Sequence, residues 1–277
     1  MCATCGCDQP GGVTITRINT EEGEFRPVSN HGQVTAHHHH HHGEQELSSE
    51  KRRIDLQQDI LSKNDTQAGH NRHHFEAGHI LAINLVSSPG SGKTSLLERT
   101  LTDLKDQYKS YVIEGDQQTL NDANRIAATG CEVVQINTGK GCHLDADMIH
   151  RSIHQLDPQD GSVVFIENVG NLVCPAMFDL GEQARVAIIS VTEGDDKPLK
   201  YPDMFESSQL CIINKIDLLP YVNFSIDKAK EYALKVNPRL SFIELSATRG
   251  EGMDRWYEWL KKEYKAIGSR KEVAVGV

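Results

Sequence analysis

The clearest chemistry in the sequence comes from a loop of small residues that ends in a lysine and a threonine. Gly90 and Gly92 lie in this loop, between an apolar run over 79–87 and a periodic helical pattern. Glycine lets backbone N–H groups turn inward around phosphate oxygens, and the helix N-terminus adds its positive dipole end. Lys93 can reach the β- and γ-phosphates, and Thr94 can offer its hydroxyl to Mg²⁺. The stretch predicts a phosphate-binding P-loop. The residues expected to hold the phosphates are Gly90, Ser91, Gly92, Lys93, Thr94 and Ser95.

This P-loop departs from the usual GxxxxGK[ST] pattern at one position. Ser87 stands where the first glycine is expected. Serine fits there if its backbone φ stays negative, so the departure weakens the pattern only slightly. The alternative is a Gly-Ser-Lys turn in front of an ordinary helix.

A second group of polar residues predicts that the base of the nucleotide is guanine. The tetrapeptide Asn214-Lys215-Ile216-Asp217 follows an apolar strand, and Ser246-Ala247 ends a later one. The Asp217 carboxylate can accept hydrogen bonds from the N1–H and the exocyclic amine of guanine, which adenine cannot offer. Lys215 can lie over the base, Asn214 can tie this loop to the P-loop, and a backbone N–H near Ala247 can meet the guanine oxygen.

Acidic residues after two other strands are candidates for Mg²⁺ binding and for placing the attacking water. Glu167 closes the apolar strand 162–167, and Gly170 can donate its N–H to the γ-phosphate. Asp116 follows another strand, in the loop expected to act as the first switch. The expected catalytic residues are therefore Lys93, Asp116 and Glu167, and Thr94, Asp116 and Glu167 are the expected Mg²⁺ ligands. Asp116 can also be an ordinary solvated turn residue.

A separate set of sulfur and nitrogen ligands predicts a second metal site. Cys142 and His143 follow the strand over 132–137, and Cys174 lies seven residues after Glu167. A mixed N/S set suits Zn²⁺ or Ni²⁺. Because Cys174 follows the γ-phosphate loop, departure of that phosphate can move a metal ligand, which is the form of a nucleotide-gated site. The alternative is two buried cysteines and an exposed histidine.

The remaining cysteines and histidines of this part of the chain have simpler interpretations. Cys131 and Cys211 lie in or beside apolar strands and are expected in the core. Four histidines are expected on the surface, namely His73, His74, His150 and His154.

The N-terminal region carries two further metal-binding patterns. Cys2, Cys5 and Cys7 lie close to a free amine, and three thiolates plus an amine nitrogen suit a planar Ni²⁺ or Cu²⁺ site; exposed thiols on a tail are the alternative. Six consecutive histidines over 37–42 indicate either native nickel storage or an affinity tag. These histidines are His37, His38, His39, His40, His41 and His42.

The elements that must position these residues alternate between apolar strands and amphipathic helices. Strands are expected at 79–87, 111–114, 132–137, 162–167, 185–191, 209–214 and 241–245, and helices near 95–107, 119–129, 145–156, 225–236 and 252–265. This order predicts an α/β fold with a doubly wound, mostly parallel sheet, which binds ligands beyond the carboxyl ends of its strands.

Composition sets the limits of the remaining regions. Residues 1–49 are expected to form a metal-binding tip followed by a disordered tether. The tether begins at residue 8, because the chain has few large apolar side chains from there to residue 49. A domain is expected over 50–267, beginning with a short helix over 50–68, and a flexible tail over 268–277. The net charge is −10. No basic stripe, membrane span or signal peptide is evident, so we expect a cytoplasmic protein that binds no nucleic acid.

Taken together, these residues resemble HypB, the family of nickel-inserting GTPases of hydrogenase maturation. The resemblance rests on the cysteine tip, on Leu61–Asp65, on the P-loop, on Cys142–Asp145, on Glu167–Pro175 and on Asn214–Asp217. It covers nearly everything except the histidine-rich linker and the last ten residues. Ser87 is compatible with this family.

The resemblance implies a SIMIBI-class GTPase that dimerises with nucleotide and metal. Cys142, His143 and Cys174 would lie near the dimer interface. It further implies GTP/GDP, Mg²⁺ and Ni²⁺ as ligands, with Zn²⁺ possible at the Ni²⁺ site, and delivery of nickel to the large-subunit precursor of [NiFe]-hydrogenase with a HypA-like partner. With no obvious arginine finger, turnover is expected to be slow. Two alternatives stay open: a nickel storage protein whose dimerisation is controlled by nucleotide, and the related urease-maturation GTPase.

Overall fold

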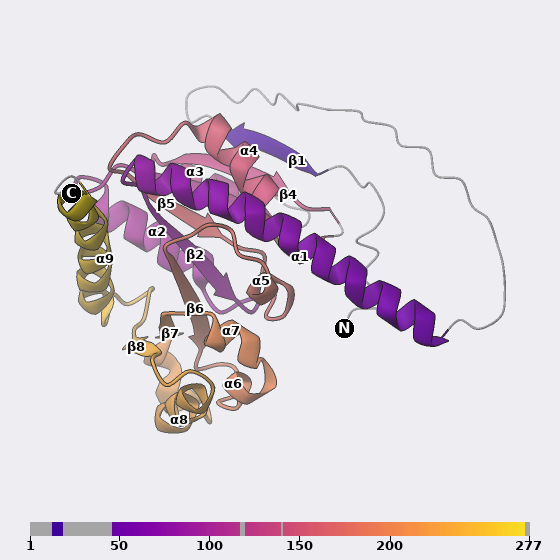
Figure 1. Cartoon of the computed structure of the whole chain (residues 1–277). Helices are drawn as coiled ribbons and strands as arrows, with labels where there is room; N and C mark the ends of the chain where they lie inside the picture. The colour runs from indigo at the N-terminus through magenta and orange to yellow at the C-terminus, as the bar shows by residue number, and fades with distance from the viewer. Residues whose placement is uncertain (1–12, 19–45, 117–119, 140, 275–277) are drawn as a thin grey trace.

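The computed structural model describes residues 13–18, 46–116, 120–139 and 141–274, which form a three-layer α/β domain (Figure 1). The strands are β1 (Thr14–Ile18), β2 (Leu81–Ser87), β3 (Ser110–Asp116), β4 (Glu132–Asn137), β5 (Val163–Glu167), β6 (Ala184–Ser190), β7 (Leu210–Asn214) and β8 (Ser241–Glu244). The helices are α1 (Glu46–Ala77), α2 (Lys93–Leu104), α3 (Asn121–Ala127), α4 (Ala146–Leu156), α5 (Cys174–Met177), α6 (Lys197–Lys200), α7 (Pro202–Glu206), α8 (Ile226–Val236) and α9 (Met253–Ala274), with a 3-10 segment η1 (Ile216–Tyr221).

The strands form one sheet in the order β1-β4-β3-β5-β2-β6-β7-β8. All neighbouring pairs are parallel except β1 with β4. The chain moves outward from β2 in one direction through β3 and β4 and later in the other through β6 to β8. The predicted doubly wound sheet is thereby confirmed, and its switch point lies at the end of β2, beside β5 and β6.

Apolar side chains on the two faces of the sheet hold the helices in place. One face packs against α2, α3 and α9. The opposite face packs against α1 and α4 over one half of the sheet and against α7 and α8 over the other. Figure 1 shows α1 lying beside α4 across the domain. All seven residues of β2 are buried, so the strand that leads into the P-loop is fixed from both faces.

The tether expected over residues 8–49 is wrong for two segments, 14–18 and 46–49, the second of which begins α1. Residues 14–18 form β1, which pairs antiparallel with β4, with Ile15 opposite Ile136. Ile15 is buried, and Arg17 forms an ion pair with Glu132 on β4. An open sheet edge with unpaired backbone groups gives a short alternating segment a partner that its own composition does not reveal. The cysteine tip and the histidines at 37–42 lie outside the described residues.

The helix bounds differ from expectation at both ends of the domain. The helix expected over 50–68 runs from Glu46 to Ala77, and α9 continues to Ala274, so residues 268–274 of the expected tail are helical. Of the apolar residues at roughly helical spacing in the expected helix, which are Ile54, Leu56, Ile60 and Leu61, Ile60 is exposed and Leu61 packs against the core. The buried side chains among those described from residue 58 to the end of α1 lie later in the helix and are Asn64, Ala68, Asn71 and Phe75.

The two buried asparagines of α1 replace apolar contacts with hydrogen bonds to backbone groups. Asn64 donates to the Asp179 carbonyl (2.8 Å) and accepts from the Ala146 amide (2.9 Å). Asn71 donates to the carbonyls of Ala146 (2.8 Å) and Leu180 (3.1 Å). Helix α1 therefore fixes the start of α4 and the loop that precedes β6.

We expect Asn71→Ala to lower the free energy of unfolding by about 1–3 kcal/mol, because it leaves buried carbonyls without their donor. Urea denaturation followed by circular dichroism measures this loss. His73→Ala, at an exposed position of the same helix, is the control and should change stability by less than about 0.5 kcal/mol. Equal effects of the two substitutions would show that these hydrogen bonds contribute nothing.

No helix in the described part of the chain is both long and apolar enough to cross a bilayer.

Candidate nucleotide and metal site

The loop between β2 and α2 has the backbone that a P-loop requires. Gly90 and Gly92 adopt φ values of 76° and 92°. The residues other than glycine with positive φ in the described ranges are His79, Asp157 and Lys215, so Ser87 keeps the negative φ that serine tolerates. A Cβ atom on Gly92 would lie 2.5 Å from Asn214 Nδ2. Glycine is therefore needed at position 92 for both conformation and space.

The segment expected to read the base is tied directly to this loop. Asn214 Nδ2 donates to the Ser91 carbonyl (2.9 Å), and Lys215 Nζ donates to the Gly90 carbonyl (2.6 Å). Asn214 Oδ1 also accepts from the Ala247 amide (3.2 Å). One asparagine thus joins the P-loop, the strand β7 and the Ser246-Ala247 turn after β8. Asp217 lies in η1 (Ile216–Tyr221), directly after this junction.

On the phosphate side, the first residues of α2 contact the end of β5. Thr94 Oγ1 donates to Glu167 Oε1 (2.6 Å), and Lys93 Nζ lies 3.3 Å from the same oxygen. Lys93 also donates to the Asn168 carbonyl. Gly170 approaches the P-loop so closely that a Cβ on it would lie 3.4 Å from Pro89. Lys93, Thr94, Glu167 and Gly170 are therefore together at the carboxyl ends of β2 and β5, whereas the other expected Mg²⁺ ligand, Asp116, ends β3.

Sequence reasoning missed a second buried carboxyl group at this position. Glu114 pairs in register with Glu167 across β3 and β5 and is buried. Burial, followed by the charge of Glu167, raises the pKa of Glu114 to about 8. Asp116 ends the same strand, and its carbonyl accepts from the Thr138 amide (2.9 Å), which joins the end of β3 to the loop that leads to Cys142.

The three residues expected to bind a metal in this domain also converge. Cys142 Sγ and Cys174 Sγ are 2.8 Å apart, and Cys142 Sγ lies 3.7 Å from His143 Nδ1. Ligand atoms of all three residues lie within 4.8 Å of one another, and the residues are half-buried. Both cysteines are free thiols. Two sulfurs and one imidazole nitrogen form a compact set for a borderline divalent cation.

Aromatic packing and burial keep His143 suited to metal binding. Its ring stacks on Phe178, with ring centroids 4.0 Å apart. Burial lowers the pKa of His143, so the neutral imidazole that binds metals is favoured. Phe178 follows α5, the short helix that Cys174 begins. The candidate metal ligand His143 is therefore in contact with the same loop that supplies Cys174.

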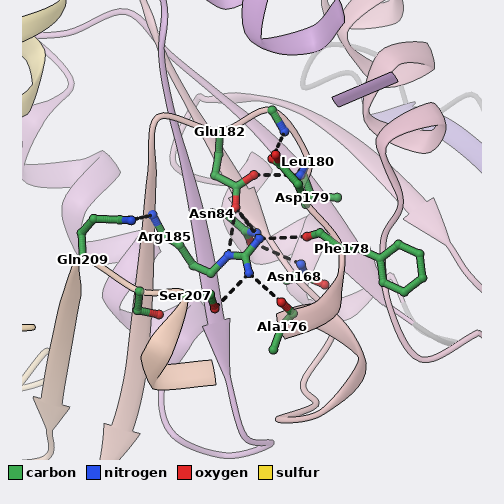
Figure 2. A network of polar contacts seen from close by, with 12 residues as sticks. Asn84, Asn168, Ala176, Phe178, Asp179, Leu180, Glu182, Arg185, Ser207 and Gln209 are labelled. Carbon is green, nitrogen blue, oxygen red and sulfur yellow. Dashed lines mark hydrogen bonds and ion pairs between the residues drawn. The ribbon is translucent and has the colours of Figure 1, made fainter. Parts of the chain in front are cut away.

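A buried polar network joins the phosphate loop, the segment after β5 that begins with Asn168, to the metal loop, the segment 174–178 that begins with Cys174 (Figure 2). Asn168 donates to Asn84 Oδ1 (3.2 Å), and Asn84 donates to Glu182 Oε1 (3.1 Å). Glu182 forms a buried ion pair with Arg185, in which Arg185 NH2 lies 2.7 Å from Glu182 Oε1. The connection runs through side chains alone, from the residue after Glu167 to the start of β6.

The guanidinium of Arg185 continues the network into the metal loop. It donates to the carbonyls of Ala176 (3.1 Å) and Phe178 (2.8 Å), on either side of the end of α5, and to Ser207 Oγ (3.1 Å). In Figure 2 these donors radiate from one guanidinium. The backbone that carries Cys174 and the Phe178 ring is thus held by the same arginine that pairs with Glu182.

These network residues were missed by the sequence analysis, although one signal was present. Asn84 is a polar residue in the middle of an otherwise apolar run, which indicates a buried hydrogen-bonding role. Nothing local marks Glu182 or Arg185. Cys131 and Cys211 lie in the core as expected, and burial raises the pKa of each thiol to about 12.

Comparison with known proteins gives the same family from sequence and from structure. Residues 81–244 match the family described as CobW/HypB/UreG, nucleotide-binding domain. The hydrogenase maturation factor HypB of Rhizobium leguminosarum is 57% identical over 226 residues, which cover 82% of this chain and 76% of the relative. HypB of Escherichia coli K12 is 55% identical over 249 residues, covering 90% and 83%.

Two solved structures are similar to the chain. The crystal structure of HypB from Archaeoglobus fulgidus matches with a TM-score of 0.69 at 38% identity, covering 74% of this chain and 100% of that one. HypB from Helicobacter pylori, solved in complex with nickel, also matches with a TM-score of 0.69 at 38% identity, covering 74% and 96%.

We expect Gly92→Ala to weaken guanine nucleotide binding by at least about ten-fold, a loss of about 1.4 kcal/mol, since the new methyl group displaces Asn214 from the P-loop. Titration with a fluorescent GDP derivative measures it. Gly69→Ala is the matched control, because a Cβ there meets nothing within 4 Å. Wild-type affinity in a folded Gly92→Ala protein would contradict the proposed fit.

Proposed function

Because the chain belongs to the HypB hydrogenase maturation factors of the CobW/HypB/UreG family, we propose that it binds nickel and uses GTP binding and hydrolysis to gate nickel delivery to a [NiFe]-hydrogenase large-subunit precursor. The observation that carries this proposal is the convergence of Cys142, His143 and Cys174 at a loop that begins at Glu167. The segment from Glu167 to Cys174 thus contributes to both the proposed phosphate site and the proposed nickel site.

Nickel is the cargo of this site. The two thiols and the imidazole supply a soft and borderline ligand set that holds Ni²⁺, and also Zn²⁺, more readily than the hard ions Mg²⁺ and Ca²⁺. The nickel complex of the Helicobacter pylori protein supports this assignment. Cys2, Cys5, Cys7 and the histidines at 37–42 are proposed as additional nickel ligands.

The phosphate side fits Mg²⁺. Glu167 is 1% exposed, and its Oε2 has no hydrogen-bond partner within the described ranges, while Thr94 places a hydroxyl beside it. Oxygen donors of this kind match Mg²⁺, with Asp116 as a further ligand. The bound ion would neutralise charge on the β- and γ-phosphates.

The contacts of Lys93 give the gating a physical basis. Its ammonium group contacts the Asn168 carbonyl and Glu167. Nucleotide phosphates compete for the same ammonium group, so nucleotide binding changes how the 167–178 loop is held. Asn84, Glu182 and Arg185 transmit that change to the backbone that carries Cys174. GTP and GDP differ by the γ-phosphate that Gly170 would contact, so the two states present the nickel ligands differently.

We propose that hydrolysis of GTP to GDP and phosphate is slow. Glu167 or Asp116 can place the attacking water, and Lys93 stabilises the phosphate charge. Arg125 donates to Ser95 at the start of α2, yet its guanidinium also pairs with Glu98 and Asp122. In these ion pairs Arg125 does not contact the phosphates at the transition state. An arginine that does so contributes a factor of about 10³–10⁵ to the rate in other GTPases.

A homodimer completes the proposal. Val173 and Met177, on either side of Cys174, are 47% and 41% exposed. Exposed apolar side chains beside a functional loop favour a protein interface, so a second copy is proposed to cover this loop when nucleotide and metal are bound. A HypA-like accessory protein and the hydrogenase precursor are the proposed partners, in the cytoplasm.

The delivery function is tested by complementation in cells that lack this gene product and are assayed for hydrogenase activity. Lys93→Ala and Cys142→Ala should each reduce activity to background, while deletion of residues 37–42 should leave it largely intact at ordinary nickel supply. The storage alternative gives the opposite pattern, in which the deletion abolishes the role and the two substitutions do not.

We expect Cys174→Ser to weaken and shift the nickel–thiolate band of the domain, because Cys142 is then the one sulfur ligand left in the set. The measurement is the sulfur-to-nickel charge-transfer absorbance of the full chain carrying Cys2→Ser, Cys5→Ser and Cys7→Ser, in which histidine-bound nickel gives no such band. Cys211→Ala is the control because its thiol is buried in the core. A band with the same wavelength and intensity as before the substitution would exclude Cys174 as a ligand.

We expect Asn84→Ala to uncouple the two sites. It removes the hydrogen bonds to Asn168 and Glu182, so the ratio of nickel affinities in the GDP and GTP-analogue states should fall toward one while both nucleotides still bind. Ser207→Ala also removes one hydrogen bond of the network, but outside this path, and should leave the ratio unchanged. An unchanged ratio in Asn84→Ala would exclude the network as the route.

A further inference from the structure

Four histidines gather at the seam between α1 and α4, away from the cysteine ligands. His150 and His154 lie one turn apart on α4, and their Nε2 atoms face each other at 3.2 Å. The rings of His74, on α1, and His154 have centroids 6.4 Å apart in an edge-on arrangement. His70 lies one turn before His74 on the same helix. Each helix thus contributes an i, i+4 pair, and such pairs share one helical face.

We propose that His150 and His154 chelate a borderline divalent cation such as Ni²⁺, Zn²⁺ or Cu²⁺ through their Nε2 atoms, beside His74 and His70 of α1. Two nitrogens bound to one tetrahedral ion at about 2.0–2.1 Å lie about 3.3 Å apart. The observed Nε2 separation of 3.2 Å matches this value. A set of imidazoles is well suited to these ions and poorly suited to Mg²⁺.

The surroundings of His150 favour the neutral ring that a metal needs. Burial and then the charge of His154 lower the pKa of His150, with smaller contributions in the same direction from His70 and His74, against the opposing effect of Asp147. His150 is half-buried and His154 and His74 are exposed, so an ion can reach the cluster from solvent. A protonated cluster would place several positive charges together, whereas one bound ion replaces this repulsion with shared coordination.

The position of the cluster separates it from the site already described. The cysteine site lies on the loops before α4 and after β5, whereas the histidines lie on the helical faces of α1 and α4. Packing between these two helices holds their backbones in place. The site is independent of the nucleotide, since none of its ligands belongs to the phosphate or guanine contacts.

The test is residue-by-residue carbethoxylation of the full-length protein, read by peptide mass spectrometry, with and without Ni²⁺ in excess over the cysteine ligands. With free Ni²⁺ at about ten times the dissociation constant, modification of His150 and His154 should slow about ten-fold, because only the unoccupied fraction reacts. Mg²⁺ should give no protection. His73, exposed on α1 and outside the cluster, is the internal control.

His154→Gln separates chelation from a plain hydrogen bond between the two rings. The substitution lies on the surface of α4 and should leave GTP hydrolysis unchanged, which checks the fold. If the pair chelates, Ni²⁺ no longer protects His150 in this variant. Unchanged modification of His150 and His154 by Ni²⁺ in the wild type, or full protection of His150 in His154→Gln, would overturn the proposal.

Discussion

The buried ion pair between Glu182 and Arg185 holds the two loops of the site in one arrangement. Both side chains are less than a tenth exposed, and leaving either charge buried without its partner would cost about 3–5 kcal/mol. Arg185 also donates hydrogen bonds to two carbonyls of the metal loop. Glu182 accepts a hydrogen bond from Asn84, which in turn accepts one from Asn168 in the phosphate loop. Neither loop can shift far without disturbing this pair, so the pair converts two adjacent loops into one coupled unit.

The fold places two different sets of candidate metal ligands a few residues apart. Glu167, at the end of β5, and Thr94, at the start of α2, present hard oxygen atoms at the site proposed for phosphates and Mg²⁺. Seven residues after Glu167, Cys174 joins Cys142 and His143 in a softer ligand set. Because ligand softness separates the ions, each site can select its own cation despite the short distance along the chain. Coupling then requires movement of a loop and no exchange of metal between the sites.

The sequence was enough to predict those site residues that follow directly after recognisable apolar strands. The P-loop, the Asn214–Asp217 segment and the cysteine and histidine ligands follow strands of clear apolar pattern, so their placement at one edge of a parallel sheet could be derived. The features that depend on distant partners could not. The strand β1 exists because β4 leaves an open edge, and α1 packs through Asn64 and Asn71, whose acceptors lie far along the chain. The Glu182–Arg185 pair and the histidine seam also arise only when separate elements meet.

The central claim is that the nucleotide changes how tightly the cysteine site holds nickel. The most direct measurement is the nickel dissociation constant of the full chain carrying Cys2→Ser, Cys5→Ser and Cys7→Ser, followed through thiolate charge transfer, with GDP and with a non-hydrolysable GTP analogue. Coupling of about 1–3 kcal/mol predicts affinities that differ by roughly 5–150-fold between the two states. Equal affinities, with both nucleotides bound, would contradict the account and leave two neighbouring sites without communication.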